Sequence, residues 1–261
     1  SFDGNMLPQA QKISHDMLMA KFQGNSKQRA MASFLLRNMQ CTAVVLNDDV
    51  WMTTHSMPSG SYLTAMLNSV INRLYTAMWY YESVPNPSIQ EFYDEVIDYV
   101  YGDDKVNGLR TSKLAPYLNA LSMEKFFLSI GMTFTTADKN KISKPFETMD
   151  EISFLKRKFV YHPGVQKIMC PLDMETLFSG LSWVDRKKDT LQVLQDKIAT
   201  FQRELYLHVD LDRVHILEQL RKRCEEECVP FKILSGSYMQ HIYTKELEFV
   251  KSNSWGGSKY V

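Results

Sequence analysis

The sequence predicts an α+β protein whose first part mixes helices and strands and whose second part is mostly helical. Two observations lead to this prediction. Short β-branched and aromatic segments alternate with helical periodicities as far as about residue 165. From Pro171 onward the pattern changes to long amphipathic segments with many charged residues, which are typical of helices. We therefore expect two domains, formed by residues 1–165 and 166–261.

Hydrophobic spacing predicts where the individual elements lie, because apolar residues recur every three or four positions in helices and every second position in strands. The expected helices are residues 9–22, 26–39, 62–81, 114–130, 173–183, 189–207 and 211–228. The expected strands are residues 41–46, 50–55, the two halves of 96–109, 132–136 and 153–163. Gly24 and Gly131 mark helix ends, and Ser88 is the expected N-cap of a further short helix after Pro85 and Pro87.

The composition excludes several classes of protein. A hydrophobic fraction of 44% and a charged fraction of 23% argue against disorder. Thirty basic residues balance thirty acidic ones, so no overall basic field indicates nucleic acid, although a local basic channel remains compatible with this balance. No apolar run approaches the ~18 residues that a membrane-spanning helix needs. Four scattered cysteines do not form a disulfide framework, which favours a reducing compartment.

The strongest chemical signal is the sequence Tyr101-Gly102-Asp103-Asp104, which is expected at the apex of a hairpin. Two adjacent carboxylates resist joint ionisation unless a cation neutralises them. Their hard oxygen atoms suit Mg²⁺ or Mn²⁺. The alternative is an ordinary exposed turn, since Asp and Gly are common turn residues.

A second polar pattern precedes this turn. The loop residues Ser59 and Gly60 are followed by Thr64, Asn68 and Asn72, which recur every four residues and so share one face of the expected helix. The rest of this helix is rich in apolar and aromatic residues. The stripe therefore indicates either a polar site or a set of buried amides that are satisfied within the protein.

Together these motifs resemble those of RNA-dependent RNA polymerases from picorna-like positive-strand RNA viruses. The pattern PSGxxxTxxxNSxxN at residues 58–72 resembles motif B, and YGDD resembles motif C. Three other segments resemble further motifs in the family's order: residues 1–4 the tail of motif A, residues 136–139 motif D and residues 154–157 motif E. Five ordered motifs make a chance resemblance very improbable.

The resemblance implies a right-hand polymerase fold. Residues 1–165 would form the palm, with an antiparallel sheet and helices, and residues 166–261 the helical thumb. The leading aspartate of motif A would precede Ser1, so that aspartate and the fingers are expected to be absent. The chain begins without an initiator methionine and is interpreted as a fragment of a viral polyprotein, inactive when isolated.

The resemblance also implies two-metal nucleotidyl transfer, with ribonucleotides added to an RNA 3′ end on an RNA template. Asp103 would be the chief metal ligand, and Asp104 a secondary ligand or an electrostatic support. Lys139 would be the general acid that protonates the pyrophosphate leaving group. The implied cofactor is Mg²⁺, with Mn²⁺ able to substitute.

The remaining site residues implied by the resemblance bind substrates. Asp3, Ser59 and Asn68 would read the ribose 2′-hydroxyl, Thr64 would support them, and Gly60 would act as a hinge. Two basic residues of motif E would contact the primer or product backbone without sequence specificity, namely Lys156 and Arg157.

The expected partners are the RNA template, the primer or product strand, nucleoside triphosphates and other viral replication proteins. Enzymes of this family work in the host cytoplasm at virus-induced membrane sites, which is the expected location.

Two alternatives stay open. A reverse transcriptase shares a Tyr-x-Asp-Asp turn, but Gly102 and the residues expected to select ribose argue against it. A non-catalytic RNA-binding or interaction remnant of the polymerase fold is the other alternative, because a missing metal ligand typically abolishes activity.

Overall fold

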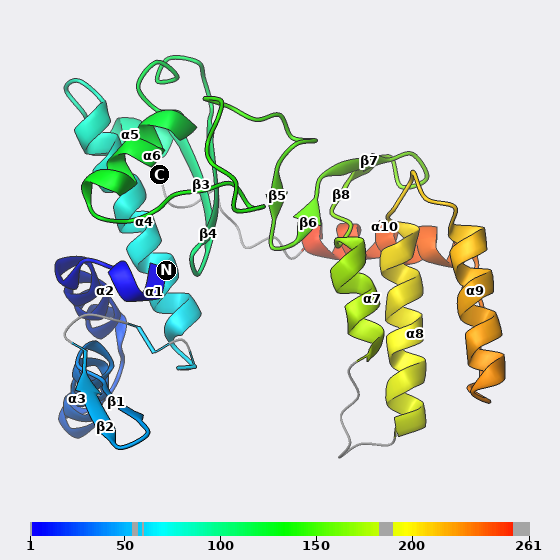
Figure 1. The fold of residues 1–261 in the computed structure, drawn as a ribbon. Coiled ribbons are helices and arrows are strands. Elements are labelled where there is room, and N and C mark those ends of the chain that lie inside the picture. The colour runs from blue at the N-terminus through cyan, green and yellow to red at the C-terminus, as the bar shows by residue number, and fades with distance from the viewer. Residues whose placement is uncertain (1, 54–56, 59, 183–189, 253–261) are drawn as a thin grey trace. The chain divides into compact units, whose positions relative to one another are not determined.

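The computed structural model describes residues 2–53, 57–58, 60–182 and 190–252. These residues fall into two compact units, 1–147 and 148–261. Helices occur together with antiparallel two-stranded sheets, which confirms the predicted α+β class (Figure 1). The division at residue 165 into a palm and a thumb stays a prediction.

The described residues of the first unit form helices and two β-hairpins. In chain order its elements are α1 (Phe2–Asn5), α2 (Pro8–Lys21), α3 (Ser26–Gln40), β1 (Ala43–Leu46), β2 (Asp49–Met52), α4 (Thr64–Ser83), α5 (Ile89–Glu95), β3 (Val96–Tyr101), β4 (Asp104–Leu109) and α6 (Ala120–Ser129). The sequence predicts each of these elements apart from the short helix α1. Ser88 caps α5 as expected, because its side chain accepts a hydrogen bond from the backbone N–H of Glu91.

Helix α4 forms the centre of the core of the first unit. Leu67, Ile71 and Tyr75 are fully buried, and their four-residue spacing places them on one face of the helix. The ring of Tyr75 contacts Phe127 of α6 edge-on, with 5.9 Å between centroids. Its hydroxyl accepts a hydrogen bond from the backbone N–H of Leu7 at 2.8 Å. Because α4 also packs against α2 and β3, it holds the elements of this unit together.

Strands β3 and β4 form the hairpin that the sequence predicts. Tyr101 pairs with Asp104, so the turn consists of Gly102 and Asp103. The φ angle of Gly102 is +65°, in the left-handed region that glycine adopts without a steric penalty. Apart from the glycine and its two chain neighbours, no described residue has an atom within 4 Å of the position that a Cβ would take there. The backbone conformation, rather than crowding, therefore explains the glycine.

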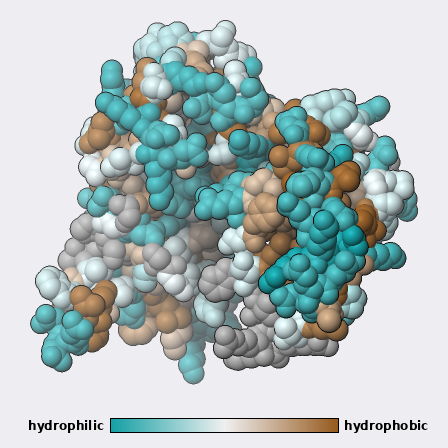
Figure 2. Space-filling model, turned by 45° about the vertical axis from the view of Figure 1, so that its right-hand side comes forward, coloured by the Kyte–Doolittle hydropathy of each residue, from teal (hydrophilic) through white to brown (hydrophobic). Residues whose placement is uncertain are grey.

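The hairpin of β1 and β2 leaves apolar side chains exposed on both strands. Val45 is 70% exposed, and Leu46 and Trp51 are each 63% exposed. Apolar side chains also lie among hydrophilic ones on the face of the molecule shown in Figure 2. None of the described helices is both long enough and apolar enough to cross a membrane.

In the second unit, the part of the chain that the structure describes forms two small hairpins followed by helices. Its elements are β5 (Ser153–Phe154), β6 (Arg157–Lys158), β7 (Val160–His162), β8 (Lys167–Met169), α7 (Met174–Ser182), α8 (Thr190–Tyr206), α9 (Arg213–Glu226) and α10 (Gly236–Ser252). Leu177 of α7 and Phe201 and Leu205 of α8 form a buried cluster. The sequence predicts α7, α8 and α9 but not α10.

Two predictions about the elements between residues 114 and 136 are wrong. The helix expected over residues 114–130 begins only at Ala120, because Pro116 disfavours helix in the preceding residues and the side chain of Asn119 caps the helix. Residues 132–136 form no strand. Phe134 instead stacks on Phe127 with 5.4 Å between ring centroids, so packing of its side chain, and no strand pairing, holds this segment.

The single strand expected over residues 153–163 is also wrong, since this segment contains β5, β6 and β7. Leu155 and Lys156 have φ angles of 54° and 61°, so the chain reverses between β5 and β6. Lys156 therefore lies in the turn and not in a strand, whereas Arg157 is the first residue of β6.

Candidate active site

The two adjacent carboxylates lie where the sequence predicts them, at the end of the β3–β4 hairpin. Asp103 and Asp104 are exposed, whereas Gly102 is buried. The side chains can therefore reach a ligand while the backbone of the turn is covered by the protein.

Helix α4 fixes the backbone of this turn through two side chains. Ser69 Oγ accepts a hydrogen bond from the N–H of Gly102 at 2.8 Å. Asn72 Nδ2 donates to the carbonyl oxygens of Gly102 and Asp103, at 3.3 and 3.0 Å. Asn72 is only 1% exposed, so these bonds lie in the interior. Ser69 and Asn72 of α4 thus hold the turn that carries the carboxylates. The contact of Ser69 could not be predicted from the sequence.

One turn earlier on α4, Asn68 contacts Asp3. Asn68 Nδ2 donates to Asp3 Oδ1 at 2.6 Å, and Asn68 is 3% exposed. The backbone carbonyl of Asp3 accepts a hydrogen bond from the N–H of Met57 at 3.1 Å. Asn68 Oδ1 is buried and has no hydrogen-bond partner among the described residues. The structure thus brings together two of the three residues expected to read the ribose, and the third, Ser59, lies outside the described residues.

The loop before α4 is tied to the first residue of that helix. Thr64 Oγ1 donates to the carbonyl of Pro58 at 2.8 Å, and its backbone N–H donates to the carbonyl of Ser61 at 3.1 Å. Gly60 is exposed, and no described residue beyond its chain neighbours has an atom within 4 Å of the position that a Cβ would take there. Thr64 therefore anchors the loop. The hinge role expected of Gly60 stays a prediction.

A lysine that the sequence reasoning missed lies directly after the acidic pair. Lys105 Nζ donates to Thr76 Oγ1 of α4 at 2.6 Å and lies 5.7 Å from the centre of the Phe127 ring. Burial lowers the pKa of Lys105 to about 8, although the negative charge of Asp98 opposes this shift. The only signal in the sequence is a basic residue next to two acids, which is a common surface pattern.

Asp98 of β3 is a third carboxylate on the face of the hairpin toward α4. Its side chain is 3% exposed and accepts a hydrogen bond from Asn107 Nδ2 at 2.7 Å. The Nε atom of Arg73 lies 3.7 Å from its Oδ2. This carboxylate belongs to the internal charge network of the hairpin and not to the exposed pair at the turn.

Lys139 lies in an exposed turn after α6. Its φ angle is 60°, and its backbone N–H donates to the carbonyl of Thr136 at 2.9 Å. The N–H of Thr136 donates in turn to the carbonyl of Asn140 at 3.0 Å. These two backbone hydrogen bonds close the turn that carries the Lys139 side chain. The proton-donating role of Lys139 stays a prediction.

In the second unit, the two basic residues of motif E differ in their surroundings. Lys156 is exposed in the β5–β6 turn. Arg157 is held internally: its two terminal nitrogens each lie 2.9 Å from an oxygen of Glu204, and one also donates to the carbonyl of Cys170 at 2.7 Å. Arg157 therefore joins β6 to α8. The predicted RNA contact of both residues stays a prediction, and Lys156 is the more accessible of the two.

Replacing Arg157 by Met is expected to reduce the local stability of α8 by about 1–2 kcal/mol, because a partly buried two-bond ion pair is lost. Hydrogen exchange of the α8 amides measures this change. Arg203→Met on the same helix is the matched control, since Arg203 is exposed. Equal protection of α8 in the two variants would show that the ion pair with Glu204 contributes nothing.

Asp103 and Asp104 are the residues suited to hold a divalent cation. Their oxygens are hard donors of the kind that Mg²⁺ prefers. Within the described ranges, no group of three or more His, Cys, Asp or Glu side chains is placed to hold a metal ion. Mg²⁺ is commonly bound by one or two carboxylates, with water and substrate phosphates completing its shell. The pair therefore fits a magnesium ion shared with a phosphorylated substrate.

Known proteins match this chain in both sequence and fold. The chain is 32% identical over 213 residues to the RNA1 polyprotein of Arabis mosaic virus, which covers 80% of this chain and 9% of the polyprotein. It is 29% identical over 191 residues to the RNA1 polyprotein of Tomato ringspot virus, covering 72% of this chain and 9% of that protein. It is also 32% identical over 161 residues to the genome polyprotein of Ljunganvirus 1, and this match covers 62% of this chain and 6% of that polyprotein.

Among solved structures, the Sicinivirus 3Dpol RNA-dependent RNA polymerase matches with a TM-score of 0.73 and 17% identity. The match covers 95% of this chain and 50% of the solved chain, and it supports the fold alone. This chain therefore spans about half of that polymerase and under a tenth of the three polyproteins. The family profile described as viral RNA-dependent RNA polymerase matches residues 1–217. Because this match covers more than half of the 261 residues, the chain belongs to the viral RNA-dependent RNA polymerase family.

Proposed function

We propose that this chain is the palm and thumb part of an enzyme that adds ribonucleotides to an RNA 3′ end on an RNA template. One observation carries the proposal. Helix α4 holds the backbone of the turn that presents Asp103 and Asp104, and one helical turn earlier its Asn68 donates a hydrogen bond to the carboxylate of Asp3. Residues 1–165 would form the palm and residues 166–261 the thumb. The fingers would come from another part of the polyprotein.

The carboxylates of Asp103 and Asp104 would bind the divalent cation, with Mg²⁺ as the natural ion and Mn²⁺ as a substitute. When bound, such ions stabilise the charge on the attacking and leaving oxygens of phosphoryl transfer. Asp103 would be the chief ligand and Asp104 a secondary ligand or an electrostatic support. Helix α4 contributes by fixing the turn before substrate arrives, so that the carboxylates need no reorganisation.

The Asp3–Asn68 pair would read the ribose of the incoming nucleotide. Asn68 Oδ1 is a buried acceptor with no partner among the described residues, and a 2′-hydroxyl is a donor that would satisfy it. The bond from Asn68 Nδ2 to Asp3 Oδ1 fixes both side chains for this contact. Ser59 would complete the set, with the loop anchored through Thr64 and free to move at Gly60.

Asn68→Ala is expected to reduce the preference for ribonucleotides over 2′-deoxynucleotides by about tenfold or more, because a site built around a hydroxyl rejects the analogue that lacks it. Competition between matched ribo- and deoxynucleoside triphosphates in primer extension measures the preference. Asn38→Ala is the control, since Asn38 is an exposed asparagine on α3. An unchanged preference in Asn68→Ala would refute the ribose-reading role.

Two basic side chains would assist the reaction. Lys139 would protonate the pyrophosphate leaving group, for which an exposed ammonium on a loop is suitable. Lys156, exposed in its turn, would contact a backbone phosphate of the primer or product strand, and Arg157 would support that turn. The proposed site of action is the host cytoplasm at virus-induced membranes, together with other viral replication proteins.

The proposal is tested by primer extension on a homopolymeric RNA template with Mg²⁺. The protein is a polymerase chain that contains these 261 residues and has the length of the solved polymerase that they match. We expect incorporation of the complementary ribonucleotide that requires both template and divalent cation. A folded chain that binds RNA in a mobility-shift assay but extends no primer would instead support a non-catalytic RNA-binding protein.

A further inference from the structure

Lys105 places a positive charge inside the first unit, one residue after the acidic pair. Its ammonium donates to Thr76 Oγ1 at 2.6 Å and lies 5.7 Å from the centre of the Phe127 ring. The buried carboxylate of Asp98 stabilises this charge. The proposed chemistry of the site assigns no role to the ammonium.

The position of Lys105 in β4 couples it to the neighbouring acid. Successive side chains of a strand point to opposite faces of the sheet. Lys105 points toward α4, since it bonds to Thr76, and Asp104 is exposed. The contact of Lys105 with α4 therefore holds the start of β4 in place, and this fixes the direction in which the Asp104 side chain points.

The contact with Thr76 extends the row of α4 side chains that holds the turn. Ser69, Asn72 and Thr76 follow one another at spacings of three and four residues and share one face of the helix. The first two bond to the backbone of the turn, and the third bonds to Lys105. Thr76 Oγ1 also donates to the carbonyl of Asn72 at 3.1 Å. The contacts on both sides of the carboxylates therefore form one connected network.

Stability alone does not explain this arrangement. Burying an ammonium group carries a large desolvation cost, which the Thr76 hydroxyl, the face of the Phe127 ring and the charge of Asp98 offset only in part. Apolar side chains of similar size at the two positions would pack against Phe127 without that cost. A pair that costs stability and lies beside two carboxylates is best explained by the placement of those carboxylates.

We propose that Lys105 is a positioning residue of the active site: bonded to Thr76, its ammonium locks β4 onto α4 and thereby sets where Asp103 and Asp104 lie. The bond between Lys105 and Thr76 is the basis for the locking of β4. The effect of this locking on catalysis rests on the proposed function. The bond ties the strand after the turn to the same helix that holds the turn.

Three variants of the polymerase chain test this inference: Lys105→Met, which keeps the length of the side chain, Thr76→Val, which keeps its shape, and the double variant. Hydrogen exchange of the amides of residues 102–105 reports the mobility of the turn. We expect exchange there to rise about tenfold in Lys105→Met. The melting temperature of the same variant should change little, because the desolvation cost of the ammonium is removed together with its attraction to Asp98.

Activity gives the second readout. In primer extension, Lys105→Met and Thr76→Val should each lower kcat by about tenfold to a hundredfold and raise the Mg²⁺ concentration for half-maximal rate, since the carboxylates are displaced. The KM for nucleotide should change little. The double variant should lose no more activity than the worse single variant, because both substitutions break the same bond.

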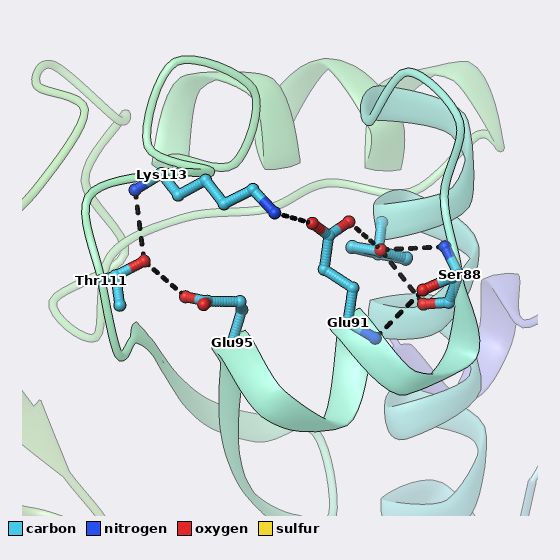
Figure 3. A network of polar contacts seen from close by, with 6 residues as sticks. Ser88, Glu91, Glu95, Thr111 and Lys113 are labelled. Carbon is cyan, nitrogen blue, oxygen red and sulfur yellow. Dashed lines mark hydrogen bonds and ion pairs between the residues drawn. The ribbon is translucent and has the colours of Figure 1, made fainter.

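Lys113→Met is the matched control. Lys113 follows the same hairpin and donates to Glu91 Oε1 at 2.6 Å, in an exposed network with Ser88, Glu95 and Thr111 (Figure 3). Its loss should leave both exchange at the turn and kcat unchanged.

Unchanged exchange in Lys105→Met, or losses of activity that merely follow the melting temperature, would overturn the positioning role. The exchange experiment does not depend on catalysis. If the wild-type chain extends no primer, the proposed function fails, while the exchange of the turn amides still decides whether Lys105 locks the strand.

Discussion

Asp103→Asn is expected to reduce ribonucleotide incorporation by about a thousandfold or more, because it removes a charged oxygen from the site that would hold the divalent cation. Asn has nearly the same shape, and the Asp103 side chain is exposed, so no buried partner is lost. The bond that Asn72 makes to this residue uses the backbone carbonyl and should persist. Single-turnover primer extension at saturating nucleotide and Mg²⁺ measures the effect.

Asp48→Asn is the matched control for this prediction. Asp48 is an exposed acid in the turn of the other hairpin of the first unit, between β1 and β2. It should retain wild-type activity. If Asp103→Asn keeps more than about a tenth of the wild-type rate, the carboxylate of Asp103 does not do the work of a principal ligand in phosphoryl transfer.

Asn72→Leu is expected to have the largest effect on folding among these variants. The amide of Asn72 is buried and donates to two carbonyl oxygens of the turn, and leucine would leave both without this donor. We expect a loss of about 2 kcal/mol in the stability of the first unit, together with a large loss of activity, since the turn would move. Thermal unfolding and primer extension measure the two effects.

The exposed residue Asn38 again offers a control, as Asn38→Leu. It should change neither quantity appreciably. A fully stable and fully active Asn72→Leu enzyme would show that the turn is held by Ser69 and by the strand pairing alone.

The sequence was informative wherever local chemistry decides the structure. The hairpin β3–β4 was predicted because Gly102 and Asp103 favour a turn between two apolar runs, and α4 because its apolar residues recur at helical spacing. Ser88 was predicted as a cap for the same local reason.

The sequence was misleading where distant contacts decide the structure. Residues 132–136 have the composition of a strand, yet Phe134 is held by stacking on Phe127. Residues 153–163 form short hairpins because Leu155 and Lys156 adopt positive φ angles. Such angles are uncommon for residues other than glycine, so the residue types do not predict them. Helix α10 starts at a Gly-Ser sequence that is typical of a loop, so it was not predicted.

The same distinction holds for the site. Asp3, Asn68 and Asp103 were predicted through a resemblance to polymerase motifs, and the structure shows Asp3 bonded to Asn68. The contacts of α4 with the hairpin join residues about thirty positions apart, such as Asn72 with Asp103. Spacing along one helix shows that polar residues share a face, but not which partner they meet. The Thr76–Lys105 bond was missed for this reason.

We propose that the turn fixed by α4 is a metal-binding catalytic centre. Its most direct test is anomalous diffraction from crystals of the polymerase chain soaked in Mn²⁺ with RNA and a nucleoside triphosphate. We expect an anomalous peak within about 2.6 Å of a carboxylate oxygen of Asp103. An ordered β3–β4 turn with nucleotide bound and Mn²⁺ held elsewhere would contradict it.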